Sequence, residues 1–319
     1  MSDHLVWIIG AGNMAVEYSK VLHALNVEHF AVGNSSTNIE NFKNQTGHPA
    51  YSGGLDHFLE KSRILPSHAI VTVNVENLYQ ITTQLINFGV KNILVEKPGS
   101  LHKWEFEKLL KLIQCRNSIV YVGYNRRFYA SVIKTRELIL DDGGLSSFNF
   151  EFTEWSHEIE KLSRPKEVFE NWFLANSTHV VDLAFFVGGK PREWATFTAG
   201  SLIWHQRASR FAGAGVTENQ IPFTYNANWE SAGRWGVEFL TTRRKLILKP
   251  LEKLFEQQRG SLNVVEVQID DNQDLEYKPG LFKQTRSFLN GDGHNLCSFS
   301  GQLLNYKFYQ RMISPNECF

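Results

Sequence analysis

The chain has 319 residues, about twice the length of a typical domain, so two domains are expected. Its 33 basic residues balance 33 acidic ones, which argues against a general nucleic-acid-binding protein because such proteins are strongly basic. Hydrophobic residues make up 42% of the chain, enough for a substantial core.

The cysteines and the apolar runs restrict the cellular setting. Cys115, Cys297 and Cys318 are far apart and odd in number, which disfavours a disulfide framework or a zinc site. No apolar run approaches membrane-spanning length, and the first apolar segment starts too early for a signal peptide. We therefore expect a cytoplasmic protein with neither a metal nor a membrane or nucleic-acid partner.

The N-terminal segment predicts a dinucleotide-binding turn. Leu5–Ile9 is predicted to be a buried strand, and Gly10-Ala11-Gly12-Asn13-Met14-Ala15 follows it directly. Gly10 permits a tight turn, Gly12 lets the backbone approach a pyrophosphate, and Ala15 lets the next helix pack closely. Apolar residues recur at helical spacing behind the motif: Met14, Tyr18, Val21, Leu22 and Leu25.

Up to residue 123, apolar strands alternate with amphipathic helices. One helix is predicted between Leu78 and Phe88 with Gly89 as its cap, and another across Phe106–Ile113. The predicted strands after the first are Phe30–Val32, Ala69–Val73, Ile93–Val95 and Ser118–Val122. Repeated β-α-β units indicate a doubly wound parallel sheet, so residues 1–123 are predicted to form an NAD(P)-binding Rossmann domain in an α/β protein.

The pattern changes after one more predicted helix, Tyr129–Leu140. Phe148, Phe150 and Phe152 alternate with polar residues, as in a strand with one solvated face. Further alternating segments are Glu193–Ala199, Trp235–Thr241, Lys245–Lys249 and Leu262–Ile269. We expect residues 124–319 to form an α+β domain with a large, mostly antiparallel sheet. Its last helix, Leu303–Met312, could pack back on the first domain.

A charged tripeptide, Glu96-Lys97-Pro98, follows the predicted strand Ile93–Val95. Ligands of open parallel sheets bind beyond the carboxyl ends of the strands, so Lys97 is a catalytic candidate. The alternative is a solvated turn whose backbone is set by Pro98. Taken with Gly123-Tyr124-Asn125-Arg126-Arg127-Phe128 and with Thr178-His179-Val180-Val181-Asp182, the tripeptide resembles the glucose-fructose oxidoreductase, inositol dehydrogenase and rhizopine-catabolism (Gfo/Idh/MocA) family.

This resemblance extends over essentially the whole chain and implies an NAD(P)-dependent oxidoreductase acting on CH-OH groups. The substrate would be a sugar, polyol or nucleotide-sugar derivative, oxidised at a secondary hydroxyl or reduced at the ketone. By resemblance, the domain of residues 124–319 would bind the substrate and support oligomerisation, and a homodimer or homotetramer is expected. The alternatives are a non-catalytic NAD(P)/sugar-binding sensor or regulator, and a redox-assisted lyase or glycosidase.

The resemblance also assigns roles to two residues: Lys97 would hydrogen-bond the reacting oxygen, and His179 would act as general acid/base. An imidazole can exchange the proton that hydride transfer requires, and an ammonium group stabilises alkoxide charge. The family usually carries an aspartate four residues before this histidine, where this chain has Ala175. Asn176 could substitute for it by hydrogen bonding, or substrate geometry could differ, or proton transfer could be weakened. Asp182 is interpreted as a helix or interface residue.

Cofactor preference is predicted from the loop Gly33-Asn34-Ser35-Ser36-Thr37, which follows the second predicted strand. An acidic residue there would bind the ribose 2′-hydroxyl of NAD. Its absence favours NADP(H), while NAD(H) remains possible because the loop has no arginine. The cofactor-binding candidates are Gly10, Gly12, Asn13, Met14, Asn34, Ser35, Ser36, Val73, Asn74, Glu96, Lys97, Pro98, Asn125 and Arg126.

Substrate-binding candidates gather in the segment from residue 155 to residue 179. Aromatic faces can cover a pyranose, and an arginine can bind a carboxylate or phosphate through two hydrogen bonds. The candidates, besides Lys97, are Trp155, Arg164, Trp172, Asn176 and His179. For each tryptophan, packing in the core is the alternative role.

Overall fold

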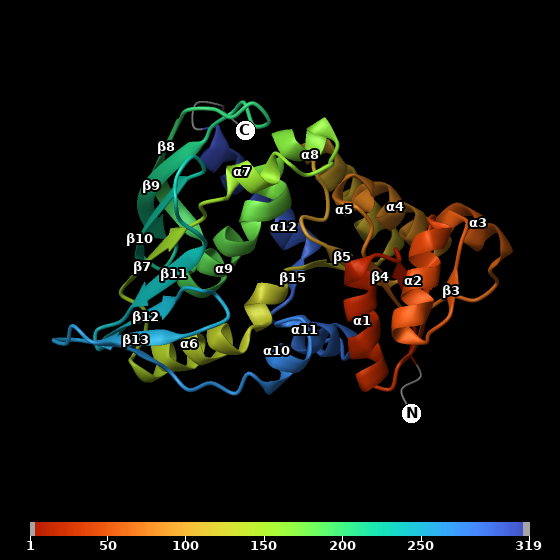
Figure 1. Cartoon of the computed structure of the whole chain (residues 1–319), viewed down its shortest axis with the longest axis horizontal. Helices are drawn as coiled ribbons and strands as arrows, with labels where there is room; N and C mark the ends of the chain where they lie inside the picture. Colours follow the sequence, from red (N-terminus) through yellow and green to blue (C-terminus); the bar gives the residue numbers. More distant parts are fainter. Residues whose placement is uncertain (1–3, 315–319) are drawn as a thin grey trace. The chain divides into compact units, whose positions relative to one another are not determined.

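The computed structural model describes residues 4–314, which form two compact units (Figure 1). The first unit contains the described residues through Asn125 together with Gln273–Leu303. The second contains Arg126–Asn272 and the described residues from Leu304 onward. Cys115 is exposed and Cys297 is buried, and both are free thiols; Cys318 lies outside the described residues.

The first unit is built around a seven-stranded sheet with the order β15-β6-β5-β4-β1-β2-β3. The strands β1 to β6 pair in parallel, and β15 joins β6 in the antiparallel sense. The strands are β1 Leu5–Ile9, β2 Glu28–Val32, β3 Ala50–Tyr51, β4 His68–Val71, β5 Asn92–Glu96, β6 Ile119–Gly123 and β15 Cys297–Ser298. The predicted doubly wound parallel sheet is therefore confirmed.

Helices cover this sheet because its strands are apolar on both faces. The side chains of Val6, Trp7 and Ile8 in β1 are fully buried. Helix α1 packs beside α2 and α11, and α4 packs beside α5 (Figure 1). The helical elements are α1 Asn13–Ala24, α2 Ser36–Thr46, α3 Gly54–Lys61, the 3₁₀ turn η1 Val75–Asn77, α4 Leu78–Phe88, α5 Lys103–Arg116 and α11 Leu281–Leu289. Helix α4 ends at Gly89 in the left-handed conformation, as its sequence predicts.

Residues 273–303 belong to the first unit by their contacts, whereas the sequence analysis placed them in the second domain. Helix α11 packs on α1, and Tyr18 is hydrogen-bonded to Gln284 at 3.2 Å. The Asn125 amide donates to the carbonyl of Pro279 at 2.9 Å. Because β15 also extends the sheet at β6, this late segment completes both a helix layer and a sheet edge.

The second unit contains an eight-stranded sheet with the order β14-β13-β12-β11-β7-β10-β9-β8. All its pairs are antiparallel except β7 with β10, so the predicted mostly antiparallel sheet is confirmed. The strands are β7 Ser147–Glu151, β8 Pro191–Ala199, β9 Arg210–Thr217, β10 Pro222–Asn228, β11 Gly236–Leu240, β12 Arg244–Leu248, β13 Phe255–Gln258 and β14 Val264–Glu266.

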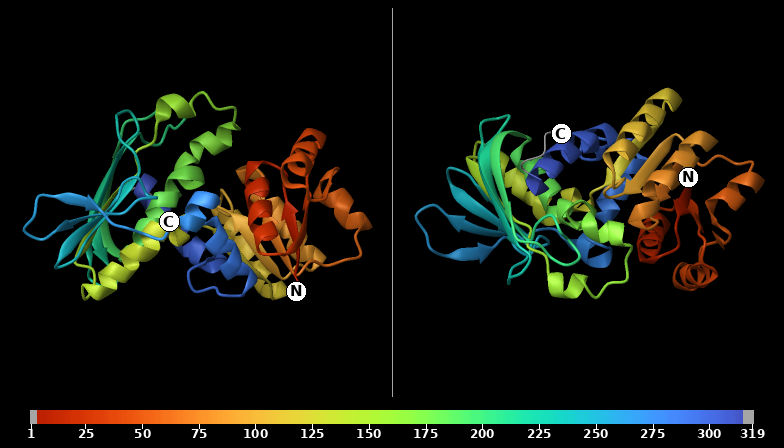
Figure 2. Two further views of the ribbon diagram at one scale, coloured as in Figure 1. Left: turned by 60° about the horizontal axis from the view of Figure 1, so that its bottom comes forward. Right: turned by 90° about the horizontal axis from the view of Figure 1, so that it is seen from above.

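The helices of this unit gather on one face of its sheet (Figure 2). They pack on an aromatic core. In this core the ring centre of Phe185 lies 5.9 Å from that of Phe148 and 5.4 Å from that of Phe150. The helical elements are the 3₁₀ turn η2 Asn125–Phe128, α6 Ala130–Asp141, α7 Ser156–Ile159, α8 Lys166–Glu170, the π-helical turn η3 Phe173–Ser177, α9 Thr178–Gly188, α10 Asn272–Glu276 and α12 Phe299–Ile313. Of these, η2, α10 and α12 extend across a unit boundary.

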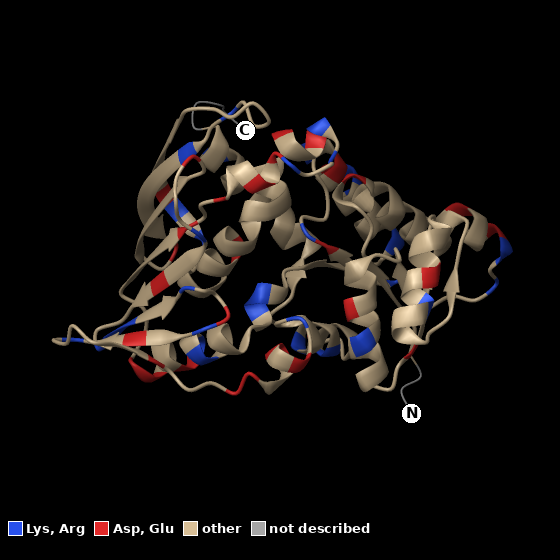
Figure 3. Cartoon of the chain, viewed as in Figure 1, with Lys and Arg blue, Asp and Glu red and all other residues tan. Residues whose placement is uncertain are grey.

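The sequence analysis missed three strands here, β9, β10 and β13. Strand β9 has the sequence RFAGAGVT, and its alanines and glycines have little preference for strands. The alternation predicted for Leu262–Ile269 produces a strand only at β14, where all three side chains are exposed. Acidic and basic residues are interspersed over both units (Figure 3). Within residues 4–314, no helix is both long and apolar enough to cross a bilayer.

Candidate active site

The glycine turn after β1 contains two glycines with different physical requirements. Gly10 has a φ of 115°, and a Cβ built there would lie 2.6 Å from Oγ1 of Thr72. The fold itself therefore requires a glycine at this position. A Cβ at Gly12 would meet no atom of the described protein within 4 Å. The space in front of Gly12 is open, as a dinucleotide-binding turn requires.

Helix α1 presents a bare N-terminus directly behind this turn. Its N-cap residue, Gly12, has no side-chain cap, and its first turn carries no acidic residue. Ala15 is fully buried, which lets the helix approach the sheet closely. The N–H groups and the positive end of the helix dipole are thus available to an anion such as a pyrophosphate. Asn13 and Met14 are the first two residues of the helix.

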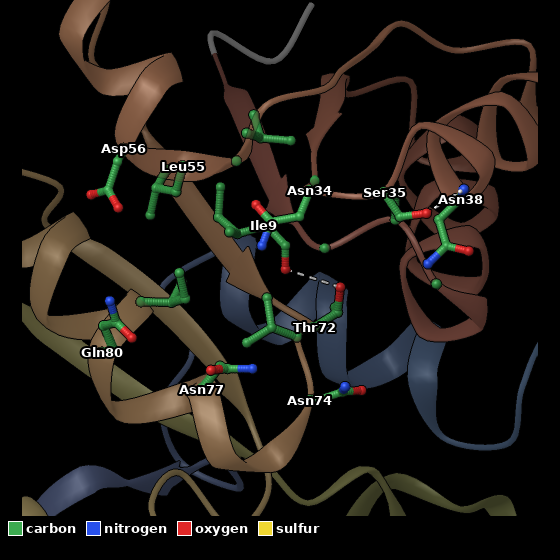
Figure 4. Close-up of a pocket in the computed structure, with 18 of the residues that line it drawn as sticks. Ile9, Asn34, Ser35, Asn38, Leu55, Asp56, Thr72, Asn74, Asn77 and Gln80 are labelled. Carbon is green, nitrogen blue, oxygen red and sulfur yellow. Dashed lines mark hydrogen bonds between the residues drawn. The ribbon is translucent and has the colours of Figure 1, made fainter. Parts of the chain in front are cut away.

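A cavity of about 350 Å³ opens at the carboxyl ends of β1, β2 and β4 (Figure 4). It brings together six of the predicted cofactor-binding residues: Gly10, Gly12, Asn34, Ser35, Val73 and Asn74. It is also lined by residues that the sequence analysis missed: Asn38, Asp56, Thr72, Asn77, Gln80 and Gln84. Thr72 directly follows β4, which ends at Val71, whereas the sequence analysis placed Thr72 inside the predicted strand Ala69–Val73. The residues from α3 and α4 carry no sequence signal of this site.

The polar groups of this cleft lie on two sides (Figure 4). On one side Ser35 caps α2, since its hydroxyl accepts a hydrogen bond from the backbone N–H of Asn38 at 3.3 Å. On the other side Asp56 accepts a hydrogen bond from the amide of Gln84 at 2.7 Å. Asp56 therefore places a carboxylate in the cleft although the loop after β2 has none. Ser36 begins α2 and is exposed, outside the cavity lining.

The tripeptide Glu96-Lys97-Pro98 forms the turn at the end of β5, outside the cavity lining. The Lys97–Pro98 peptide is cis. Burial raises the pKa of the Glu96 carboxyl, against the opposing effect of Lys97, and Tyr18 donates a hydrogen bond to it at 2.9 Å. The amide of Gln302 donates to the Pro98 carbonyl at 3.0 Å. Hydrogen bonds therefore fix the residue before Lys97 and the residue after it, and Lys97 itself is half-buried.

The motif after β6 divides between the two units. Asn125 is buried in the first unit, where its amide binds the Pro279 carbonyl. Arg126 begins the second unit, and its guanidinium lies 4.9 Å from the ring centre of Trp235. Arg127 binds the buried carboxylate of Asp182, with Nε 2.7 Å from Oδ2.

His179 is the second residue of α9, which directly follows the π-helical turn. It is only 7% exposed, and its ring centre lies 5.9 Å from that of Trp235. Asp182, one turn further on, is engaged by Arg127 and also by Asn305 at 3.4 Å. Asp182, interpreted from the sequence as a helix or interface residue, thus pairs with side chains of two other elements.

A buried carboxylate lies beside the segment that lacks the expected aspartate. Glu154, 1% exposed, accepts hydrogen bonds from the Asn176 amide at 3.0 and 3.2 Å and from the Ser177 hydroxyl at 2.7 Å. Nη1 of Arg234 lies 3.5 Å from Oε2 of Glu154. The sequence analysis missed Glu154, because it lies 22 residues before Asn176 and no local spacing relates them.

The other substrate candidates occupy different surroundings within the second unit. Trp155 is 47% exposed, its indole N–H donates to the Gly233 carbonyl at 2.9 Å, and Arg234 lies 4.7 Å from its ring centre. Trp172 is buried against Phe169 and Trp204, as its alternative role in the core predicts. Arg164 is exposed in the loop between α7 and α8.

Comparison of the sequence with protein families gives one match. Residues 5–124 match the model of the GFO_IDH_MocA oxidoreductase family, described as an NAD-binding Rossmann fold. The matched residues include the glycine turn and the strands β1 to β6, so this part of the chain is similar to the NAD-binding part of that family. The match confirms the resemblance over the glycine turn and the tripeptide after β5, and it ends at Tyr124, inside the motif after β6. No curated protein matches the chain in sequence.

Solved structures with the same fold cover both parts of the chain. UDP-N-acetylglucosamine 3-dehydrogenase GnnA from Acidithiobacillus ferrooxidans is 13% identical, covering 97% of this chain and 96% of that one at a TM-score of 0.74. Dehydrogenase MviM from Clostridium difficile is 16% identical, and the match covers 98% of this chain and 100% of that one at a TM-score of 0.79. Levoglucosan dehydrogenase, solved with NADH and L-sorbose, is 13% identical, and the match covers 98% of this chain and 96% of that one at a TM-score of 0.77. At these identities the likeness establishes the fold.

Proposed function

We propose that this oxidoreductase is an NAD(P)-dependent dehydrogenase acting at a secondary hydroxyl, or its ketone, of a sugar derivative. The observation that carries the proposal is the cleft at Gly12, open in front of an uncapped helix N-terminus, in a domain that matches an NAD-binding family. Two proteins of the same fold are named as dehydrogenases of UDP-N-acetylglucosamine and levoglucosan, which supports a substrate of the sugar type.

In this proposal Lys97 and His179 perform the acid/base part of the reaction. When bound, the nicotinamide group accepts or supplies the hydride. The ammonium group of Lys97 donates a hydrogen bond to the reacting oxygen and stabilises its negative charge. The imidazole of His179 takes the proton from that oxygen, or returns it. Glu154 holds the segment before His179 through Asn176 and Ser177.

A substrate screen tests this function. The purified protein is assayed with NADP⁺ and NAD⁺ against polyols, free sugars, sugar acids and nucleotide sugars, following reduced-cofactor absorbance. Lys97→Met and His179→Ala should each lower turnover by about 10²–10⁴-fold and retain the wild-type unfolding temperature. Activity that survives both changes would overturn the roles. Product formation without a net change in cofactor would indicate a redox-assisted lyase or glycosidase, and binding without turnover a sensor.

We also propose that the cleft prefers NADP(H). The loop Gly33–Thr37 contributes amide and hydroxyl groups and no carboxylate that would repel a 2′-phosphate. Calorimetric titration of NADPH and NADH tests the preference, and Asn34→Asp should shift it toward NADH. Tighter binding of NADH by the unaltered protein would contradict the proposal and would point to Asp56 as the ribose ligand.

A further inference from the structure

A second cavity, of about 330 Å³, lies wholly within the second unit. It is lined by Arg126, Arg234, Trp235, Lys249, Pro250, Leu251 and Glu252. We call it the arginine pocket. No function assigned above uses it, although one of its walls, Trp235, contacts His179.

The register of three strands builds this pocket. Gly236 in β11 pairs with Glu151 at the end of β7, and Val237 pairs with Leu248 at the end of β12. Residues just outside these pairs therefore emerge at the same end of the sheet: Arg234 and Trp235 before β11, and Lys249–Glu252 after β12. The hydroxyl of Ser131 in α6 donates to the Leu251 carbonyl at 2.6 Å and fixes the segment after β12.

The lining carries three cations and one carboxylate, and two of the cations have acidic neighbours outside it. Arg234 lies 3.5 Å from Glu154, and Lys249 lies 2.6 Å from Glu151. Arg126 differs, because among residues 4–314 its side chain makes no hydrogen bond or ion pair. Burial lowers its pKa, and the nearby charge of Arg234 lowers it further, against the opposing effects of Tyr129 and Glu252. Burying a cation that has no ion pair among the described residues is unfavourable.

Both arginines contact the same aromatic ring. The guanidinium carbons of Arg126 and Arg234 lie 4.9 and 4.7 Å from the ring centre of Trp235. Such stacking restricts each guanidinium while leaving in-plane N–H groups able to bind an anion. The ring centre of His179 lies 5.9 Å from that of Trp235. The pocket therefore presents two restrained guanidinium groups next to His179, the proposed acid/base.

We propose that the arginine pocket binds an anionic group of the substrate, a phosphate or carboxylate carried by the sugar, through Arg126 and Arg234. The assignment of the anion to the substrate rests on the proposed function. The anion site itself is inferred from the residues of the pocket. It assigns Arg126 to the substrate, whereas the sequence analysis assigned it to the cofactor. Guanidinium groups bind either anion through two parallel hydrogen bonds, so the chemistry is shared.

Binding without turnover tests the site. The full chain, without NAD(P), is titrated calorimetrically with glucose 1-phosphate, glucuronate and glucose. One of the two anionic probes should bind more tightly than glucose, and the tighter one identifies the anion as phosphate or carboxylate. Arg234→Gln and Arg126→Gln should each weaken that binding by about tenfold or more. Arg259→Gln, at an exposed arginine of the same unit, should leave it unchanged.

Arg234 is the cleaner variant, because its side chain is 44% exposed and its loss should leave the fold intact. Arg126→Lys is the second one; it keeps the charge and removes the planar fork, so it should still weaken binding. The proposal is overturned if neither anion binds better than glucose, or if anion affinity is unchanged in Arg234→Gln and Arg126→Lys. Because no cofactor is present, this result is independent of the dehydrogenase assay.

Discussion

At the scale of single residues, the two glycines of the turn separate the demands of folding from those of binding. Gly10 is required by a positive φ and by Thr72, while Gly12 faces open space. The carboxylate of Glu154 binds the segment before His179, although Glu154 lies more than twenty residues away in the sequence. Each of these features gives a prediction that distinguishes a structural role from a functional one.

Gly10→Ala and Gly12→Ala should have opposite phenotypes. The first should lower the free energy of unfolding by about 2 kcal/mol or more, because it adds left-handed strain and a clash with Thr72. The second should change stability by less than about 0.5 kcal/mol and weaken NAD(P)H binding by about tenfold or more. Urea unfolding and calorimetric titration measure the two effects. Wild-type cofactor affinity in Gly12→Ala would show that the turn does not hold the pyrophosphate.

Glu154→Gln should reduce kcat by about ten- to a hundredfold with little change in KM, because Asn176 and Ser177 lose a charged acceptor. Since Glu154 acts through this segment, the variant should also shift the pH dependence of kcat. Glu158→Gln, at an exposed glutamate of α7, is the matched control. If kcat and its pH profile match the wild type, Glu154 has no positioning role.

At the scale of secondary structure, a buried ion pair fixes the end of α6 to the β11–β12 hairpin. Asp142, the C-cap residue of α6, receives hydrogen bonds from Arg244 at 3.0 Å and from Thr241 at 2.8 Å. Arg244 also binds Glu256 in the neighbouring strand β13. One guanidinium therefore connects a helix with two strands of the large sheet.

Asp142→Asn should destabilise the protein by about 3 kcal/mol near neutral pH, because Arg244 loses a buried partner. Burial alone would raise the pKa of Asp142, but the hydrogen bonds from Arg244 and Thr241 outweigh it and lower the pKa below 3.8. This carboxylate thus contributes stability above its unfolded pKa, which is lost as the pH falls through the folded value. The difference between variant and wild type in urea unfolding should shrink below about pH 4. A difference independent of pH would exclude the ionic mechanism.

At the scale of the whole molecule, buried histidines should make the first unit sensitive to acid. Burial is the main cause that lowers the pKa of His29 in β2, and of His68 in β4, from 6.5 to about 4. Between pH 6.5 and 4 the unfolded chain binds more protons, so stability falls as the pH falls. Each histidine accounts for up to about 3 kcal/mol of this loss.

His29→Gln should therefore reduce the slope of unfolding free energy against pH over this interval, whatever its effect on stability at pH 7. His294→Gln provides a comparison, because His294 is an exposed residue of the same unit and is not among the groups that lower the pKa of His29. Urea titrations at several pH values measure the slopes. Equal slopes in His29→Gln and in the wild type would contradict the assignment.

The sequence predicted what is encoded locally. The strand Leu5–Ile9, its glycine turn and the Gly89 cap all depend on neighbouring residues, and the structure places them as expected. Glu154, Arg234 and Trp235 could not be found in this way, because strand register alone brings them together. The same holds for residues 273–303, whose amphipathic helix shows which face is buried but not which unit it covers.

The chain passes from one unit to the other three times, after residues 125, 272 and 303. A fragment cut at residue 125 would thus lack α11 and β15, leaving an apolar side of α1 bare and β6 as an open sheet edge, which invites aggregation. A separately expressed first unit must therefore include residues 273–303, joined to residue 125 by a linker. For the same reason, exchanging one unit between proteins of this fold requires three junctions rather than one.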